Sequence, residues 1–283
     1  AVIIYTSGTT GSPKGVMLTY KNILANAKAV TEEVPFFTAD QRVMVLLPLH
    51  HIFPLLGSLV APLLVGGIVA FSPTMTSEDI IETLQDNKIT MIIGVPKFYD
   101  TIRKGIINKI NSHTIARFLF LMAKRLRSKT VSKKLFKTVH QRLGGHIKYL
   151  ICGGAKLDVQ IYEDFKALGF DIYEGFGMTE AAPMITFPRL GHTKAGSAGQ
   201  ELFKGSVRID DGEVTVRGDQ IMKGYYNKPE TTAEAIKDGW LYTGDRGYID
   251  KKGFLFITGR IKEIIVLPSG KNINPVEIET KIE

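Results

Sequence analysis

The feature that most restricts the fold of this chain is the alternation of short apolar runs with helix-like segments. The apolar runs cover residues 43–47, 91–95, 149–152 and 170–173, and segments with helical spacing of apolar residues lie at 77–87 and 158–168. Strands that are apolar on both faces are typical of parallel sheets, in which helices cover both sides. The sequence therefore predicts an α/β fold with a mostly parallel sheet covered by helices.

One uncharged stretch resembles a membrane span. Residues 52–71 are 20 residues without a charged side chain, which is long enough to cross a bilayer. Helix-breaking and small residues interrupt it, namely Pro54, Gly57, Ser58, Pro62, Gly66 and Gly67. The uncharged run also continues back to residues 43–47, which favour a buried strand. We therefore expect a strand, a loop, a short buried helix and a second strand over 43–71.

The pattern changes after about residue 205. Residues 206–209 and 213–216 alternate apolar and polar side chains around Asp210-Asp211-Gly212, a sequence typical of a tight hairpin turn. Residues 248–257 repeat this arrangement. We expect an α/β region at 1–204, a small antiparallel β subdomain at 205–260 and a separate segment at 261–283.

Cysteine and histidine content excludes two classes of site. The only cysteine is Cys152, so neither a disulfide framework nor a cysteine zinc site can form. We expect Cys152 to be a small core residue, with a reactive thiol as the alternative. His113, His140, His146 and His192 have no spacing that suits a metal site, and we expect them to be structural or on the surface.

The positive charge is concentrated in one segment. The chain has a formal net charge of +8, and residues 101–157 contain 14 Lys and Arg and no Asp or Glu, which leaves 22 basic and 28 acidic residues elsewhere. This distribution argues against a general nucleic-acid binder and favours a local patch that faces phosphates or an anionic membrane.

Within this segment the apolar residues Ile115, Phe118, Leu119, Met122 and Leu126 have helical spacing. A second run around 131–139 suggests a basic amphipathic hairpin. Three interpretations stay open: a solvated face over a core contact, a peripheral membrane contact through residues 101–148, or binding of coenzyme A phosphates.

A loop rich in glycine and hydroxyl side chains follows the first apolar run. It reads Thr6-Ser7-Gly8-Thr9-Thr10-Gly11-Ser12-Pro13-Lys14-Gly15. Glycines let backbone N–H groups converge on an anion, hydroxyls add donors and Lys14 adds a positive charge. The sequence predicts a phosphate-binding loop, although not a P-loop, because no Gly-Lys-Ser/Thr opens a helix. A mobile turn is the alternative.

These residues resemble the signature loop of the adenylate-forming superfamily, which includes acyl-CoA synthetases, peptide-synthetase adenylation domains and firefly luciferase. Four further motifs follow in that family's order: Gly153-Gly154-Ala155, Tyr173-Glu174-Gly175-Phe176-Gly177-Met178-Thr179-Glu180, Tyr242-Thr243-Gly244-Asp245 and Gly259-Arg260-Ile261-Lys262-Glu263. The resemblance covers the whole chain and is greatest to long- or medium-chain fatty acyl-CoA synthetases.

The resemblance implies a role for each motif. Thr6, Ser7, Gly8, Thr9, Thr10, Gly11 and Lys14 would hold phosphates, Gly153, Gly154 and Ala155 would form a wall for adenine, and Tyr173 would stack on the base. Thr179 would donate to the α-phosphate, Glu180 would hold Mg²⁺, and Asp245 and Arg260 would bind the ribose. His51, with His50 as second choice, would border the acyl carboxylate. Each residue also has a structural alternative: Glu180 as a helix N-terminal acid, Asp245 as a turn residue, Tyr173 as core and His51 as a loop histidine.

The implied activity is a ligase that uses ATP, Mg²⁺ and coenzyme A. A fatty acid would form an acyl-adenylate, which a thiol then attacks. The alternatives are a nucleotide-binding fragment or pseudoenzyme without turnover, or transfer to a carrier-protein thiol. We expect a fragment that lacks an N-terminal part, with Lys262 as the hinge to a C-terminal lid of which 261–283 is the start. The expected location is cytoplasmic, with peripheral membrane contact left open.

Overall fold

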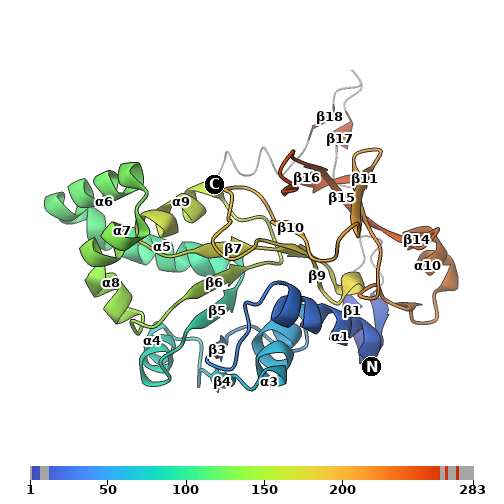
Figure 1. The fold of residues 1–283 in the computed structure, drawn as a ribbon, viewed down its shortest axis with the longest axis horizontal. Coiled ribbons are helices and arrows are strands. Elements are labelled where there is room, and N and C mark those ends of the chain that lie inside the picture. The colour runs from blue at the N-terminus through green and yellow to red at the C-terminus, as the bar shows by residue number, and fades with distance from the viewer. Residues whose placement is uncertain (1, 7–12, 262–264, 267–271, 274–283) are drawn as a thin grey trace.

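The computed structural model describes residues 2–6, 13–261, 265–266 and 272–273 (Figure 1). The strands are β1 (Val2–Thr6), β2 (Lys14–Leu18), β3 (Arg42–Val45), β4 (Ile68–Phe71), β5 (Met91–Gly94), β6 (Tyr149–Cys152), β7 (Ile172–Glu174), β8 (Phe176–Gly177), β9 (Met184–Phe187), β10 (Gln200–Glu201), β11 (Val207–Asp210), β12 (Glu213–Val216), β13 (Gly224–Tyr225), β14 (Ile236–Lys237), β15 (Trp240–Ile249), β16 (Leu255–Arg260), β17 (Ile265–Val266) and β18 (Asn272–Ile273).

The α-helices are α1 (Tyr20–Lys28), α2 (Ile52–Pro54), α3 (Ala61–Leu64), α4 (Ser77–Asp86), α5 (Pro96–Asn111), α6 (Thr114–Leu126), α7 (Lys129–Leu135), α8 (Lys137–Arg142), α9 (Val159–Ala167) and α10 (Pro229–Ala235). Two π-helical turns, η1 (Ala29–Glu33) and η2 (Leu55–Val60), and one 3₁₀ turn, η3 (Thr179–Ala181), complete the elements.

The predicted parallel sheet is confirmed. Five strands pair in parallel in the order β4-β3-β5-β6-β7. Successive side chains of a strand point to opposite faces. Met44 and Ile92 accordingly pack in a core with α4, α5 and α9, whereas Val43 and Ile93 pack in a second core with η1 and α3.

The uncharged stretch folds as the sequence predicts. It contains the three short helical elements α2, η2 and α3, followed by the edge strand β4. Among the described residues no helix combines the length and hydropathy that crossing a membrane requires. Its helical part instead packs against one face of the parallel sheet, and β4 forms one edge of that sheet.

The antiparallel part is also confirmed. β11 and β12 form a hairpin whose turn residues, Asp211 and Gly212, both have positive φ (48° and 78°). A two-residue turn of type I′ requires positive φ at both positions. β15 pairs with β12, β14 and β16. β2 pairs with both β1 and β13, and these strands share one apolar core with the antiparallel sheet, including Val16, Val214 and Leu241. The domain boundaries at 205 and 261 stay predictions.

The basic segment differs from the expected hairpin. Helix α5 leads into α6, and the second predicted run is divided at Phe136 into α7 and α8. Phe136 is buried against Phe120 of α6 with ring centroids 6.0 Å apart, so the chain turns inward at this residue. The second run of the predicted hairpin therefore forms two short helices. Most of the expected lid segment 261–283 lies outside the described residues.

Candidate active site

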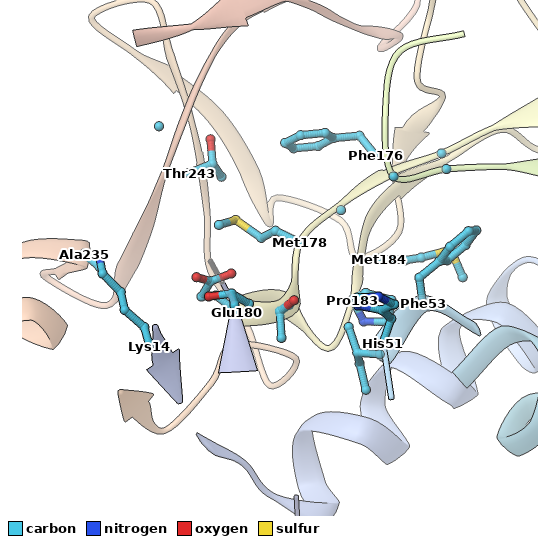
Figure 2. Close-up of a pocket in the computed structure, with 18 of the residues that line it drawn as sticks. Lys14, His51, Phe53, Phe176, Met178, Glu180, Pro183, Met184, Ala235 and Thr243 are labelled. Atoms are coloured by element: carbon cyan, nitrogen blue, oxygen red, sulfur yellow. The ribbon is translucent and has the colours of Figure 1, made fainter. Parts of the chain in front are cut away.

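A cavity of about 840 Å³ lies where the parallel sheet meets the antiparallel strands. Its walls come from β1 and β2, from the loops after β6 and β7, from α2 and from β12 and β15. Figure 2 shows Lys14 and Glu180 close together on one side of this pocket, and His51, Phe53, Pro183 and Met184 gathered on another. The pocket therefore has a charged part and a largely apolar part.

Most predicted site residues that the structure describes line this cavity. They are Thr6, Lys14, His51, Gly153, Gly154, Thr179, Glu180 and Arg260. Ala155, Tyr173 and Asp245 are not among the lining residues. Ser7, Gly8, Thr9, Thr10, Gly11 and Lys262 lie outside the described residues.

Glu180 is held at the bottom of the charged part. Its side chain is buried, and its Oε1 accepts a hydrogen bond from the Tyr225 hydroxyl at 2.8 Å. Burial and the adjacent carboxylate raise the pKa of Tyr225, so its hydroxyl keeps the proton that it donates. The Lys14 ammonium lies 5.1 Å from the centre of the same ring. A cation from β2 and an anion from η3 thus converge on Tyr225.

The turn that carries Glu180 is fixed from behind by Asn26. Thr19 caps α1 and exchanges hydrogen bonds with Asn22, which sets the direction of this helix. One turn later the fully buried Asn26 amide donates to the carbonyls of Ala181 (3.1 Å) and Met184 (2.8 Å). Sequence reasoning missed Asn26, because its partners are 155 and 158 residues away.

Gly177 permits the close approach that closes this turn. A Cβ atom at this position would lie 2.2 Å from the Pro183 carbonyl oxygen, a backbone atom that cannot move aside easily. The Met178 N–H donates to the same oxygen at 2.9 Å. The glycine in the predicted motif is therefore needed for the backbone geometry.

The predicted stacking role of Tyr173 is contradicted. Tyr173 is only 2% exposed, and its ring packs against Phe36 (4.7 Å between centroids), Tyr149 (5.9 Å) and Phe187 (6.4 Å). No face of the ring is left for a base, because the apolar core beneath β7 surrounds it. The aromatic side chain of this motif that lines the cavity is Phe176. Strand β7 ends at Glu174, and the chain then brings Phe176 to the pocket.

The glycine wall after β6 is present in part. Gly153 faces the Phe53 ring so closely that a Cβ would lie 2.9 Å from its Cζ. Gly154 has φ +83°, a conformation that side chains rarely adopt. Ala155 is exposed and lies outside the lining, so the wall consists of Gly153 and Gly154.

Asp245 lies next to the pocket and is paired with Arg260. It is buried, and its Oδ1 accepts a hydrogen bond from Arg260 Nε at 3.0 Å across the β15–β16 pair. Its neighbours Thr243 and Gly244 line the cavity. Glu213, which also lines it, accepts from the Gly244 N–H at 2.7 Å and holds this bend. The sequence did not single out Glu213.

Two further groups lie under the glycine wall. Cys152 is fully buried, as predicted for a core residue, and burial followed by the nearby Glu174 raises the pKa of its thiol. Glu174 accepts a hydrogen bond from the Leu157 N–H at 2.9 Å. Burial raises the pKa of Glu174 to about 7, against smaller opposing effects of that hydrogen bond and of Lys156.

His51 is the histidine that lines the cavity, whereas His50 does not. It precedes α2 in extended conformation, and its ring lies 4.3 Å from that of His50. It stands where the charged part meets the apolar part made by Ile52, Phe53 and Met184. This position suits a group that borders the carboxylate of an acid with an apolar tail.

Glu180 is the candidate metal-binding carboxylate of the charged part. Among the residues that the structure describes, no three His, Cys, Asp or Glu side chains cluster as a metal site. Mg²⁺ that bridges nucleotide phosphates takes only one or two protein carboxylates and completes its shell with phosphate oxygens and water. Glu180, which projects into the cavity beside Lys14, fits that donor set.

Comparison with protein families gives one match that covers most of the chain. The family described as AMP-binding enzyme matches residues 1–226. A long-chain-fatty-acid–CoA ligase, FadD15 of Mycobacterium bovis, is 32% identical over 305 residues, which cover 100% of this chain and 50% of the relative. A feruloyl-CoA synthase of an Amycolatopsis species is 31% identical over 294 residues, which cover 99% of this chain and 53% of the relative. The chain spans about half the length of these curated relatives.

Solved structures agree with this match. The o-succinylbenzoate CoA synthetase (MenE) of Bacillus subtilis, in complex with the acyl-adenylate intermediate OSB-AMP, superimposes with a TM-score of 0.77 at 27% identity over 98% of this chain and 52% of that one. The same enzyme in complex with ATP and a magnesium ion superimposes with a TM-score of 0.75 at 27% identity. The match covers 99% of this chain and 54% of that one. Both show the same α/β arrangement as this chain.

Proposed function

This chain belongs to the AMP-binding enzyme family, and we propose that it activates a carboxylic acid with ATP and passes the acyl group to the thiol of coenzyme A. The observation that carries this proposal is the single cavity that unites Lys14, Glu180 and the Gly153-Gly154 wall with an apolar part beyond His51. One part suits a nucleotide and its phosphates, and the other suits an acyl group.

In the first step a carboxylate oxygen of the acid attacks the α-phosphorus of ATP. The bond from this phosphorus to the bridging oxygen breaks, and pyrophosphate leaves with the bonding electrons. Such a transfer depends on positioning and on neutralising charge. Lys14 places its ammonium beside the phosphates, and Thr179 donates a hydrogen bond to the α-phosphate.

Glu180 contributes through its fixed carboxylate. Tyr225 donates to one oxygen and Asn26 holds the backbone behind it, so the carboxylate keeps one direction in the pocket. Mg²⁺ bound there would neutralise phosphate charge. In the second step the thiol loses its proton, its sulfur attacks the acyl carbon and AMP leaves. A carrier-protein thiol is the alternative acceptor.

We propose a fatty acid as substrate. The side chains Ile52, Phe53, Met184 and Phe187 give the acyl part an apolar lining. The similarity to a long-chain-fatty-acid–CoA ligase supports this choice. The nearly equal identity to a feruloyl-CoA synthase makes an aromatic acid the second candidate.

ATP–pyrophosphate exchange tests the proposal. We expect exchange that requires both Mg²⁺ and an acid, and that is faster with fatty acids than with a hydroxycinnamic acid. The reverse preference would favour the second candidate. AMP binding without acid-dependent exchange would instead indicate a nucleotide-binding protein without turnover.

A further inference from the structure

Helix α6 exposes an apolar stripe that the proposed active site does not use. Phe120 and Ala123 face the core, whereas large apolar side chains on another side face solvent. These exposed residues are Ile115, Phe118, Leu121, Met122 and Leu126, with Ile115 76% and Phe118 62% exposed. Four of them recur at intervals of three and four residues, so they form one continuous stripe along the helix.

Unpaired cations border this stripe. Several basic residues of the segment are neutralised by acids of other elements: Arg103 and Lys124 pair with Asp164, and Arg127 pairs with Glu163. Arg117 and Arg125 of α6 are exposed, and their side chains have no ion pair or hydrogen bond within the part of the chain that the structure describes. The same holds for Lys133, Lys134 and Lys137 of α7 and α8.

Within the part of the chain that the structure describes, the position of α6 leaves this surface accessible. Figure 1 shows α6 and α7 at one extreme end of the molecule, opposite α10 and β14. Val131 and Leu135 of α7 are also exposed and extend the apolar area beside those lysines. An apolar stripe with cations along its border is the pattern of helices that lie in the headgroup region of a bilayer.

We propose that α6, together with α7, docks this protein on an anionic membrane surface. The stripe would enter the boundary between headgroups and acyl chains, and Arg117, Arg125 and the α7–α8 lysines would contact acidic headgroups. Charge complementarity favours an anionic membrane over a second copy of this chain as the partner of this surface. A second copy would bring the same unpaired cations together, and like charges across an interface oppose association.

Co-sedimentation with vesicles tests this proposal. We expect binding to vesicles with about 30% phosphatidylglycerol at about 0.1 M salt, and weak binding to neutral phosphatidylcholine vesicles. At about 0.5 M salt, where screening reaches only a few ångströms, binding should fall steeply. Absence of binding to the anionic vesicles would overturn the proposal.

Matched variants locate the surface. Ile115→Ser with Phe118→Ser should weaken vesicle binding at least about tenfold, because the apolar area that would leave water is removed. Leu63→Ser with Met75→Ser, two exposed apolar residues elsewhere, should leave it unchanged. Equal binding of the α6 variant and the parent would overturn the proposal.

The charge contribution has its own control. Arg117→Glu with Arg125→Glu should weaken binding at least about tenfold, whereas Lys223→Glu with Lys251→Glu, which changes the net charge equally, should have a much smaller effect. Equal effects of both pairs would mean that only net charge attracts the protein, against the proposal.

Insertion can be observed directly with Phe118→Trp. Its fluorescence should shift to shorter wavelength on anionic vesicles and be quenched by brominated lipid, while the parent, which has only the buried Trp240, should show little change. An unshifted and unquenched Phe118→Trp would overturn the proposal. So would a dimer in sedimentation velocity that Ile115→Ser with Phe118→Ser dissociates.

Discussion

The segment 173–180 contains two pairs of an aromatic residue and a carboxylate, and the two pairs occupy different environments. The first pair, Tyr173 and Glu174, lies in the interior under the glycine wall. The second pair, Phe176 and Glu180, lines the cavity. The two carboxylates are almost equally buried, 7% and 8% exposed. What separates them is their surroundings, because Glu174 faces a backbone N–H and Glu180 faces a tyrosine hydroxyl and the pocket.

The difference shows how a short motif can serve both packing and chemistry. β7 is an edge strand of the parallel sheet, and all three of its residues are nevertheless buried. After Gly175 the chain leaves this sheet and pairs as β8 with β9. The change of sheet turns the next side chains toward the cavity.

The largest expected effect separates the two carboxylates. Glu180→Gln keeps an acceptor for Tyr225 but removes the charge that would hold Mg²⁺, so adenylate formation should fall by a factor on the order of 10² to 10³. Glu174→Gln, the matched control, should change it less than about threefold. ATP–pyrophosphate exchange in the full-length protein measures both. Calorimetry of AMP without metal should show nearly equal affinities for Glu180→Gln and the parent. Equal loss of exchange in both variants would refute the metal role.

The second prediction uses the pKa of Glu174. Its folded-state pKa of about 7 is above the ordinary 4.5, so the folded protein holds an extra proton between these values. The free energy of unfolding should therefore fall as pH rises from about 5 to 8, with a contribution of about 2–3 kcal/mol from this residue. Urea unfolding of the parent and of Glu174→Gln at both pH values measures the difference in slope. Parallel pH dependences would contradict the assignment.

Most of the fold could be predicted because local patterns determine it. The apolar runs at 43–47 and 149–152 became β3 and β6, and the Asp211-Gly212 turn formed its hairpin. The strand order β4-β3-β5-β6-β7 was not predicted. Nor was the packing of β1 and β2 with the antiparallel sheet. Both depend on pairings between distant residues, which a local pattern does not contain.

The candidate site was predictable as motifs but not residue by residue. The motif resemblance indicates Glu180, which lines the pocket, but it gives the stacking role to Tyr173, which is buried in the core. The distinction depends on where the chain leaves the parallel sheet, which becomes visible only in three dimensions. Asn26 and Glu213 were missed for the same reason, since each acts on the backbone of a distant turn.

The third prediction compares the two aromatic residues. Phe176→Leu should weaken AMP binding about tenfold, within the 1–3 kcal/mol that stacking on an aromatic ring contributes. Tyr173→Phe keeps the ring that fills the core and loses only a hydroxyl contact of 3.5 Å with the Gly191 N–H, so AMP affinity should change less than about twofold. Titration calorimetry measures both. A larger loss in Tyr173→Phe would restore the stacking role to Tyr173.

The smallest expected effect concerns Asp245, which combines both environments. It is buried and paired like Glu174, yet its neighbours Thr243 and Gly244 line the cavity as Glu180 does. If Asp245 binds the ribose, Asp245→Asn should weaken the binding of AMP about fivefold, which corresponds to about 1 kcal/mol for one hydrogen bond. Binding of 2′,3′-dideoxy-AMP, which lacks both hydroxyls, should be unaffected by the same substitution. Asp210→Asn, which alters a carboxylate bonded to Tyr242, serves as the control. If Asp245 has only a structural role, in which Arg260 holds it, Asp245→Asn would instead weaken the binding of both nucleotides equally. The bend that carries Thr243 and Gly244 would then shift whichever nucleotide is bound.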